Sequence, residues 1–131
     1  MLRWLIFILF ACLTINAHAA DLKQSDISLI ESVGVPVYSE AIFVYGNSDV
    51  GFRFATSVSP DEVRKWYREK LPKWSVLDEY GSWIMYDGKP GAGLGEVMSK
   101  NQILIKKNED LPGWYSLEKS LTTEITIMIV K

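Results

Sequence analysis

The sequence predicts an α+β fold, in which an antiparallel sheet of about five to six strands carries one main amphipathic helix, residues 60–71, on one face. Several short runs of β-branched and aromatic residues are separated by glycine, asparagine and aspartate, the pattern of strands joined by tight turns. One segment combines a strong helix start with apolar residues at helical spacing. We prefer this arrangement to a closed all-β barrel with a helical excursion.

The N-terminal residues 1–19 have the features of a cleaved signal peptide. A basic residue and an apolar run, residues 4–13, precede Ala17 and Ala19, which are small residues where signal peptidase inspects the chain. The run is shorter than the roughly 20 apolar residues of a membrane-spanning helix. We therefore expect a single α+β domain, residues 20–131, that is periplasmic or secreted and has no membrane span once the signal is removed.

The leader also permits a second interpretation. Residues 9–12, Leu-Phe-Ala-Cys, are similar to the lipobox before the acylated cysteine of bacterial lipoproteins, although phenylalanine fits the second position poorly. Lipid anchoring through Cys12 is therefore one alternative to plain cleavage, and an uncleaved anchor is another.

Cleavage after Ala19 would remove the only cysteine, Cys12, and the only histidine, His18. The remaining chain would then have no thiolate or imidazole metal ligand and no serine–histidine or cysteine–histidine catalytic pair. We therefore expect no metal centre and no cofactor, and any catalysis would rest on carboxylates, lysine, tyrosine or serine.

The charge balance gives the chain no general attraction for polyanions. It has 14 basic and 16 acidic residues, and losing Arg3 with the leader changes the net charge from −2 to −3. A weakly acidic domain is not drawn to nucleic acid or to an anionic membrane surface. We expect no nucleic-acid partner, and the composition leaves the oligomeric state open.

The first half of the domain predicts a short helix and a β-hairpin. Residues 25–33 are expected to form a helix with Ser25 as its N-cap. Residues 37–45 and 51–57 carry β-branched and aromatic side chains, and the turn-forming residues 46–49 separate them. These two runs should pair as antiparallel strands.

The helix at 60–71 has the clearest start and stop signals in the chain. Ser59 and Glu62 form a capping box around Pro60, whose missing N–H costs nothing in the first helical turn. Pro72 prevents the helix from continuing. One face of the helix carries an apolar stripe: Val63, Trp66, Tyr67 and Leu71. We expect this stripe in the core and the basic side, which includes Arg64, in solvent.

The second half of the chain predicts four further strands. They are residues 74–80, 82–87, 101–107 and 122–130. In the last of these, isoleucines alternate with other residues, which is typical of a strand with one buried face. As the final strand, it is also a candidate sheet edge that could pair with another chain. Trp74 and Trp83 are expected to be at least half-buried.

Two segments are candidate binding sites. The loop 88–95 contains Lys89, Gly91 and Gly93, and glycines let a partner approach the backbone closely. It lacks the order of residues that a phosphate-binding loop requires, so we do not expect nucleotide binding there. Trp114 and Tyr115 follow a turn, where exposed aromatic side chains would suit a partner contact. The alternative in both cases is a purely structural role.

Part of the chain resembles small bacterial envelope proteins. The resemblance is carried by Phe-Ala-Thr at 54–56, Ser-Pro-Asp-Glu-Val at 59–63, Trp-Tyr at 66–67, Leu-Pro at 71–72 and Val-Pro-Val-Tyr at 35–38. The chain departs from the pattern at Ser39-Glu40, where Pro-Gly often follows. Over residues 35–74 this resemblance implies a secreted or lipid-anchored α+β domain, and it carries over no catalytic or binding residue.

These observations lead to one main hypothesis and two alternatives. The main hypothesis is an exported, non-enzymatic domain that binds a protein or another envelope component, such as a glycan. The first alternative is a carboxylate-dependent envelope enzyme such as a glycan hydrolase, which needs two acids facing each other across a cleft. The second is an accessory subunit of an envelope complex.

Overall fold

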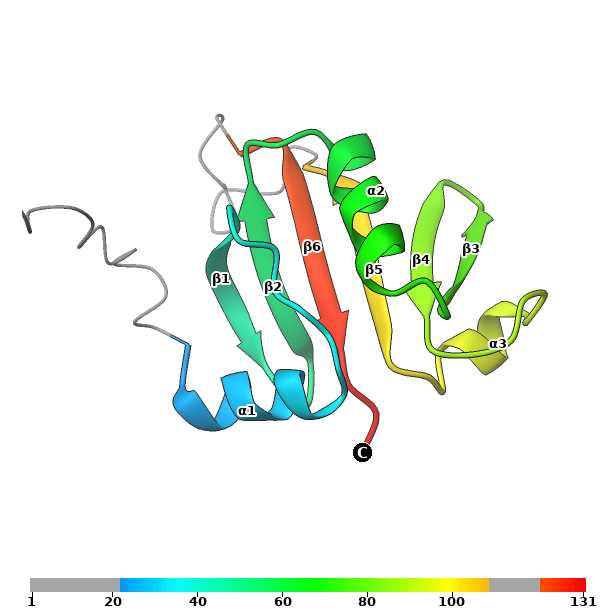
Figure 1. The fold of residues 1–131 in the computed structure, drawn as a ribbon, viewed down its shortest axis with the longest axis horizontal. Helices are drawn as coiled ribbons and strands as arrows, with labels where there is room; N and C mark the ends of the chain where they lie inside the picture. The colour runs from blue at the N-terminus through cyan, green and yellow to red at the C-terminus, as the bar shows by residue number, and fades with distance from the viewer. Residues whose placement is uncertain (1–21, 109–120) are drawn as a thin grey trace, which may run out of the picture.

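The computed structural model describes residues 22–108 and 121–131, which form three helices and six strands (Figure 1). In chain order these are α1 (Gln24–Ser32), β1 (Ile42–Asn47), β2 (Gly51–Thr56), α2 (Pro60–Lys70), β3 (Ser75–Glu79), β4 (Ser82–Tyr86), α3 (Leu94–Val97), β5 (Gln102–Lys107) and β6 (Thr123–Met128).

All six strands belong to one open sheet with the order β1-β2-β6-β5-β4-β3, and every neighbouring pair is antiparallel. The predicted α+β class with an antiparallel sheet is therefore confirmed. The suggestion that the final strand is an edge is wrong, because β6 pairs with both β2 and β5. Within the described residues the edges are β1 and β3.

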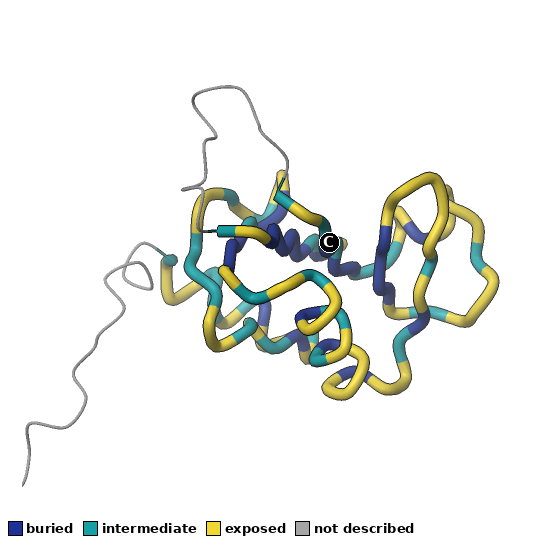
Figure 2. The backbone as a smooth tube through the Cα atoms, turned by 90° about the horizontal axis from the view of Figure 1, so that it is seen from above, coloured by how far each residue is buried: buried dark blue, intermediate teal, exposed yellow. Residues whose placement is uncertain are grey.

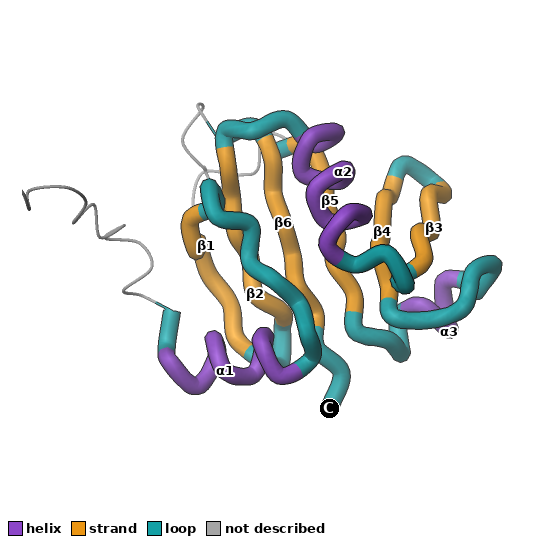
Figure 3. Tube along the Cα trace, viewed as in Figure 1, coloured by secondary structure: helices purple, strands orange, loops and turns teal. Residues whose placement is uncertain are grey.

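The main core lies between the sheet and the two longer helices, α1 and α2, which cover the same face (Figures 1 and 3). Alternate strand residues point into this core: Phe52, Phe54, Trp83, Met85, Ile103, Ile105, Ile125 and Ile127. The buried positions run along the central strands and the inner sides of these helices (Figure 2). This is the layer arrangement that the alternating pattern predicts.

A smaller cluster lies on the opposite face of the sheet, beside β4. It consists of Ile84 and Tyr86 from β4 and Val97 from α3. The short helix α3 was not predicted, because the expected loop 88–95 extends into its first turn. A helix of four residues has too little periodicity to be recognised from sequence.

Helix α2 begins as predicted. The Ser59 hydroxyl accepts a hydrogen bond from the Glu62 amide at 3.4 Å, and Pro60 occupies the first helical position. Val63 and Tyr67 are fully buried, whereas Trp66 is half-buried against the core.

We expected the basic side of α2 in solvent, but Arg64 on that side is only partly solvated. The Arg64 guanidinium donates to the Ile105 carbonyl oxygen at 3.1 Å and lies 5.5 Å from the centre of the Trp83 ring. Arginine can pack its stem and planar head against an aromatic face while keeping its charge, so it joins the edge of the core.

Two N-terminal boundaries differ from the prediction. Helix α1 starts at Gln24, so Ser25 lies inside the helix, and Lys23 occupies the N-cap without a side-chain bond. Strand β1 starts at Ile42 rather than at residue 37. Residues 35–41 instead run back from α1 across the helix-covered face of the sheet to β1 (Figure 1). Packing against α1 and α2 overrides the local strand preference of these residues.

Replacing Gly46 with alanine is expected to destabilise the protein by about 2–3 kcal/mol. Gly46 has a φ of 130°, and a Cβ there would collide with the Gly51 carbonyl oxygen across the β1–β2 hairpin. Gly81 is the matched control, because it has a φ of 76° but open space around its Cβ position. Urea unfolding should show a loss of only about 1 kcal/mol for Gly81→Ala. Equal losses in the two variants would contradict the steric argument.

Candidate functional site

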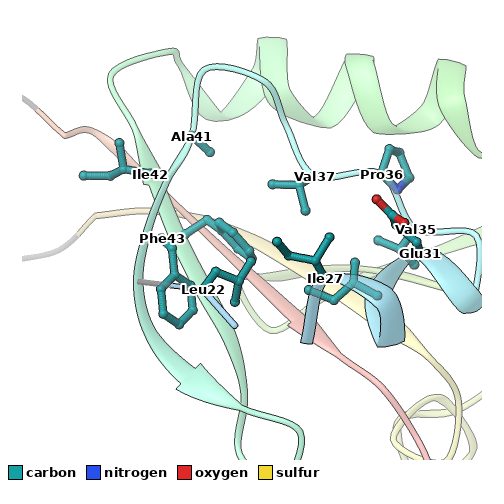
Figure 4. Close-up of a pocket in the computed structure, with 11 residues that line it drawn as sticks. Leu22, Ile27, Glu31, Val35, Pro36, Val37, Ala41, Ile42 and Phe43 are labelled. Atoms are coloured by element: carbon teal, nitrogen blue, oxygen red, sulfur yellow. The ribbon is translucent and has the colours of Figure 1, made fainter. Parts of the chain in front are cut away.

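An apolar pocket lies at the β1 end of the molecule, between α1, the segment 35–41 and the first two strands (Figure 4). Its volume is about 350 Å³. It is lined by Leu22, by Ile27, Ile30 and Glu31 of α1, by Val35, Pro36, Val37 and Ala41, and by Ile42, Phe43 and Phe54 of the hairpin. Natural small-molecule pockets have volumes of roughly 300–1,000 Å³ and mostly apolar walls, and this pocket meets both criteria.

The floor of the pocket is part of the main core. Ile30, Val35 and Phe54 are at most 2% exposed. The Phe54 ring also meets the Phe43 ring edge-on, with centroids 5.6 Å apart. Since these side chains are fixed by the sheet and by α1, the pocket has a rigid base.

The wall formed by residues 35–41 is held from behind by α2. The Tyr67 hydroxyl donates to the Pro36 carbonyl oxygen at 3.0 Å. The neighbouring Trp66 ring packs edge-on against Tyr38, with centroids 5.1 Å apart. Burial raises the pKa of the Tyr67 phenol far above its usual value, so the hydroxyl stays protonated and remains a donor. The predicted aromatic pair on α2 therefore shapes the pocket from outside its lining.

The rim of the pocket reaches solvent. Val37 is 36% exposed, and its side chain points toward Ile27 across the pocket (Figure 4). On α1, Ile27 and Glu31 are four residues apart and therefore share one helix face, which explains why a carboxylate lines an apolar pocket. Among the described residues that line the pocket, Glu31 is the only one with a charged side chain.

Comparisons with protein-family models, curated proteins and solved structures find no match for this chain. The chemistry of the pocket is therefore the guide to function.

The lining can bind hydrocarbon but offers little for catalysis. The described residues that line it include one carboxylate and no lysine, tyrosine or hydroxyl side chain. A glycan hydrolase needs two carboxyl groups at a defined separation across its substrate. In the part of the chain that the structure describes, no group of three or more histidine, cysteine, aspartate or glutamate residues is placed to hold a metal ion.

A buried carboxylate elsewhere in the fold does not complete such a pair. Glu124 on β6 is 3% exposed, and its oxygens lie 3.6 Å from the Arg53 guanidinium and 3.9 Å from the Lys106 ammonium. Glu124 alternates with Ile125 along β6, so it lies on the face opposite the helix-covered core. The sheet therefore separates it from Glu31.

The predicted site residues of the glycine loop lie elsewhere. Lys89, Gly91 and Gly93 are exposed and follow β4, at the other end of the sheet from the pocket. The Tyr86 hydroxyl donates to the Lys89 carbonyl oxygen at 2.7 Å and accepts from the Ala92 amide at 3.4 Å. These bonds fold the loop around the Tyr86 ring, and the structure does not bring the loop together with the pocket.

The other two predicted residues, Trp114 and Tyr115, lie outside the described residues. No helix in residues 22–108 and 121–131 has both the length and the apolar character needed to cross a bilayer.

Proposed function

We propose that this protein is an exported, non-enzymatic domain that binds the apolar chain of an envelope component in the pocket between α1 and β1. The observation that carries the proposal is the pocket itself, with about 350 Å³ of space and a lining of hydrocarbon side chains around a single carboxylate. Burial of apolar surface is the main source of affinity at such a site.

The volume of the pocket supports an alkyl chain as its occupant, since it exceeds the space that one small side chain or ring would fill. A cavity of roughly 150 Å³ suffices to bind benzene. The pocket here has about 350 Å³, which is more than twice that space. Each methylene buried in it should contribute about 0.8 kcal/mol, which corresponds to a roughly four-fold gain in affinity.

A charge at the rim should weaken binding of an apolar dye. We expect Val37→Asp to lower the affinity for 1-N-phenylnaphthylamine by at least about ten-fold, because the carboxylate would have to be desolvated beside the bound ring. Val76→Asp is the matched control, since Val76 is 38% exposed against 36% for Val37 but lies on β3, far from the pocket. Dye fluorescence titrations measure both affinities, and circular dichroism checks the folds.

The proposal fails if the unmodified protein does not bind the dye. It also fails if the aspartates at positions 37 and 76 weaken binding equally, because the dye would then not occupy this pocket.

Export is proposed from the leader, with its apolar run at 4–13 and small residues at positions 17 and 19. The intact mass of the protein isolated from the envelope fraction tests it. A chain that begins at Ala20 supports cleavage of a plain signal. If the protein were instead found in the cytoplasmic fraction, with a mass that includes residues 1–19, export would be contradicted.

A further inference from the structure

We propose that Glu31 makes the pocket select amphiphiles with a positively charged headgroup, such as a primary amine, and disfavour those with an anionic headgroup. This inference rests on the proposed function, because it assumes that an apolar chain occupies the pocket. It assigns a specificity-determining residue and a chemical class of ligand.

The position of Glu31 suits a headgroup contact. Figure 4 shows the Glu31 carboxylate at one end of the pocket, close to Pro36, whereas Leu22 and Phe43 lie toward the other end. An alkyl chain between these ends would bring its polar terminus to Glu31. The other described side chains of the lining are hydrocarbon and offer a headgroup neither a charge nor a hydrogen bond.

The Glu31 carboxylate has no side-chain partner among the described residues. In the described parts of the chain, Glu31 makes no ion pair, and its side chain accepts no hydrogen bond from another residue. Its negative charge is therefore available to a ligand, and charge complementarity favours a cation there.

Helix stability does not explain the residue. Glu31 lies in the last turn of α1, a helix with no basic residue in that turn. The helix dipole disfavours a negative charge at this end. A carboxylate at this position lowers the stability of α1. We therefore attribute its presence to the pocket that it faces.

The discrimination should be modest, because Glu31 is exposed and its charge is partly screened by solvent and salt. Exposed ion pairs contribute enough to change affinity by about two- to five-fold. We expect a difference of this size between a cationic and a neutral headgroup, and a similar difference between a neutral and an anionic one.

Three probes with the same chain separate the effect of the headgroup from that of the pocket. They are n-octylamine, 1-octanol and nonanoate, which all carry an octyl chain, titrated at pH 7 and followed by calorimetry. At this pH the amine is protonated and the acid is ionised. The expected order of affinity is octylamine, then octanol, then nonanoate.

Two variants assign that order to Glu31. In Glu31→Gln, octylamine and octanol should bind equally well, and nonanoate should gain about two- to five-fold in affinity. Glu69→Gln is the matched control, because Glu69 is an exposed helical glutamate of α2 that does not line the pocket. It should keep the order of the unmodified protein.

The outcomes distinguish this inference from the proposed function. If the three probes bind the unmodified protein equally well, or if Glu31→Gln keeps the preference for the amine, the headgroup inference is overturned while the pocket function stands. If none of the probes binds, both fail.

Discussion

Phe54→Ala is expected to lower the free energy of unfolding by about 3–5 kcal/mol. Phe54 is 2% exposed on β2, packs edge-on against Phe43, and belongs to both the main core and the floor of the pocket. Removing its ring leaves a cavity that the sheet cannot close, because β2 is paired on both sides. Small domains have only about 5–15 kcal/mol of stability, so the loss would be a large share of the total.

Urea unfolding followed by circular dichroism measures this effect. Leu94→Ala serves as the control, since Leu94 is 51% exposed at the start of α3. The control should change stability by no more than about 0.5 kcal/mol. A loss below about 1 kcal/mol for Phe54→Ala would mean that this ring is not packed as the structure places it.

Tyr67→Ala is expected to have an effect of similar size, about 3–5 kcal/mol. Tyr67 is fully buried on α2, packs against Trp66 with ring centroids 4.8 Å apart, and donates to the Pro36 carbonyl oxygen. The change removes both the packing of α2 and the bond that holds the wall of the pocket. We therefore expect weaker ligand binding as well as lower stability, measured by dye titration and urea unfolding.

Tyr67→Phe separates these two contributions. It keeps the ring but leaves the Pro36 carbonyl without its donor, which should cost about 1–2 kcal/mol. If this variant were as unstable as Tyr67→Ala, the ring would contribute nothing to the core, and the account of α2 would be wrong.

The pH dependence of stability offers a further check on Tyr67. Burial raises the pKa of its phenol in the folded protein, so the stabilisation is complete below the unfolded value of about 10. It is lost as the pH rises from there toward the folded pKa, because the unfolded chain releases the proton first. Above pH 10 the unmodified protein should lose stability more steeply than Tyr67→Phe, by about 1.4 kcal/mol per pH unit.

The parts of the fold that were predicted correctly have local causes. The capping box of Ser59 and Glu62 identifies the start of α2 without any knowledge of the sheet. Alternating isoleucines likewise predict that β6 is a strand. The place of β6 at the centre of the sheet was missed, because strand order depends on which distant strands pair, and no local pattern encodes that choice.

The extended segment 35–41 before β1 also shows that a local sequence pattern does not determine strand pairing. Val37 has a high strand preference, yet it lies on the rim of the pocket because the chain must return from α1 to the sheet edge. A strand preference describes how a side chain fits a pleated surface, and it does not decide whether a partner strand is present.

The candidate site was harder to predict than the fold. Lys89 and Gly91 remain predicted binding residues, and the structure adds only that the Lys89 carbonyl and the Ala92 amide bond the Tyr86 hydroxyl. The sequence signal for the pocket is weak: Ile27 and Glu31 share a helix face, but a cavity forms only when α1, the hairpin and the segment between them meet. A feature that points to the pocket is Glu31 itself, a carboxylate in the last turn of a helix that has no basic residue in that turn.

The central claim is that the pocket between α1 and β1 binds an apolar chain, and methyl chemical shifts test it most directly. Isotopically labelled protein would be titrated with 1-octanol. We predict shifts for the methyl groups of Ile27, Ile30 and Val37, which line the pocket, and none for those of Ile84 and Val97 in the cluster on the opposite face. Shifts confined to Ile84 and Val97, or no shifts at all, would contradict the claim.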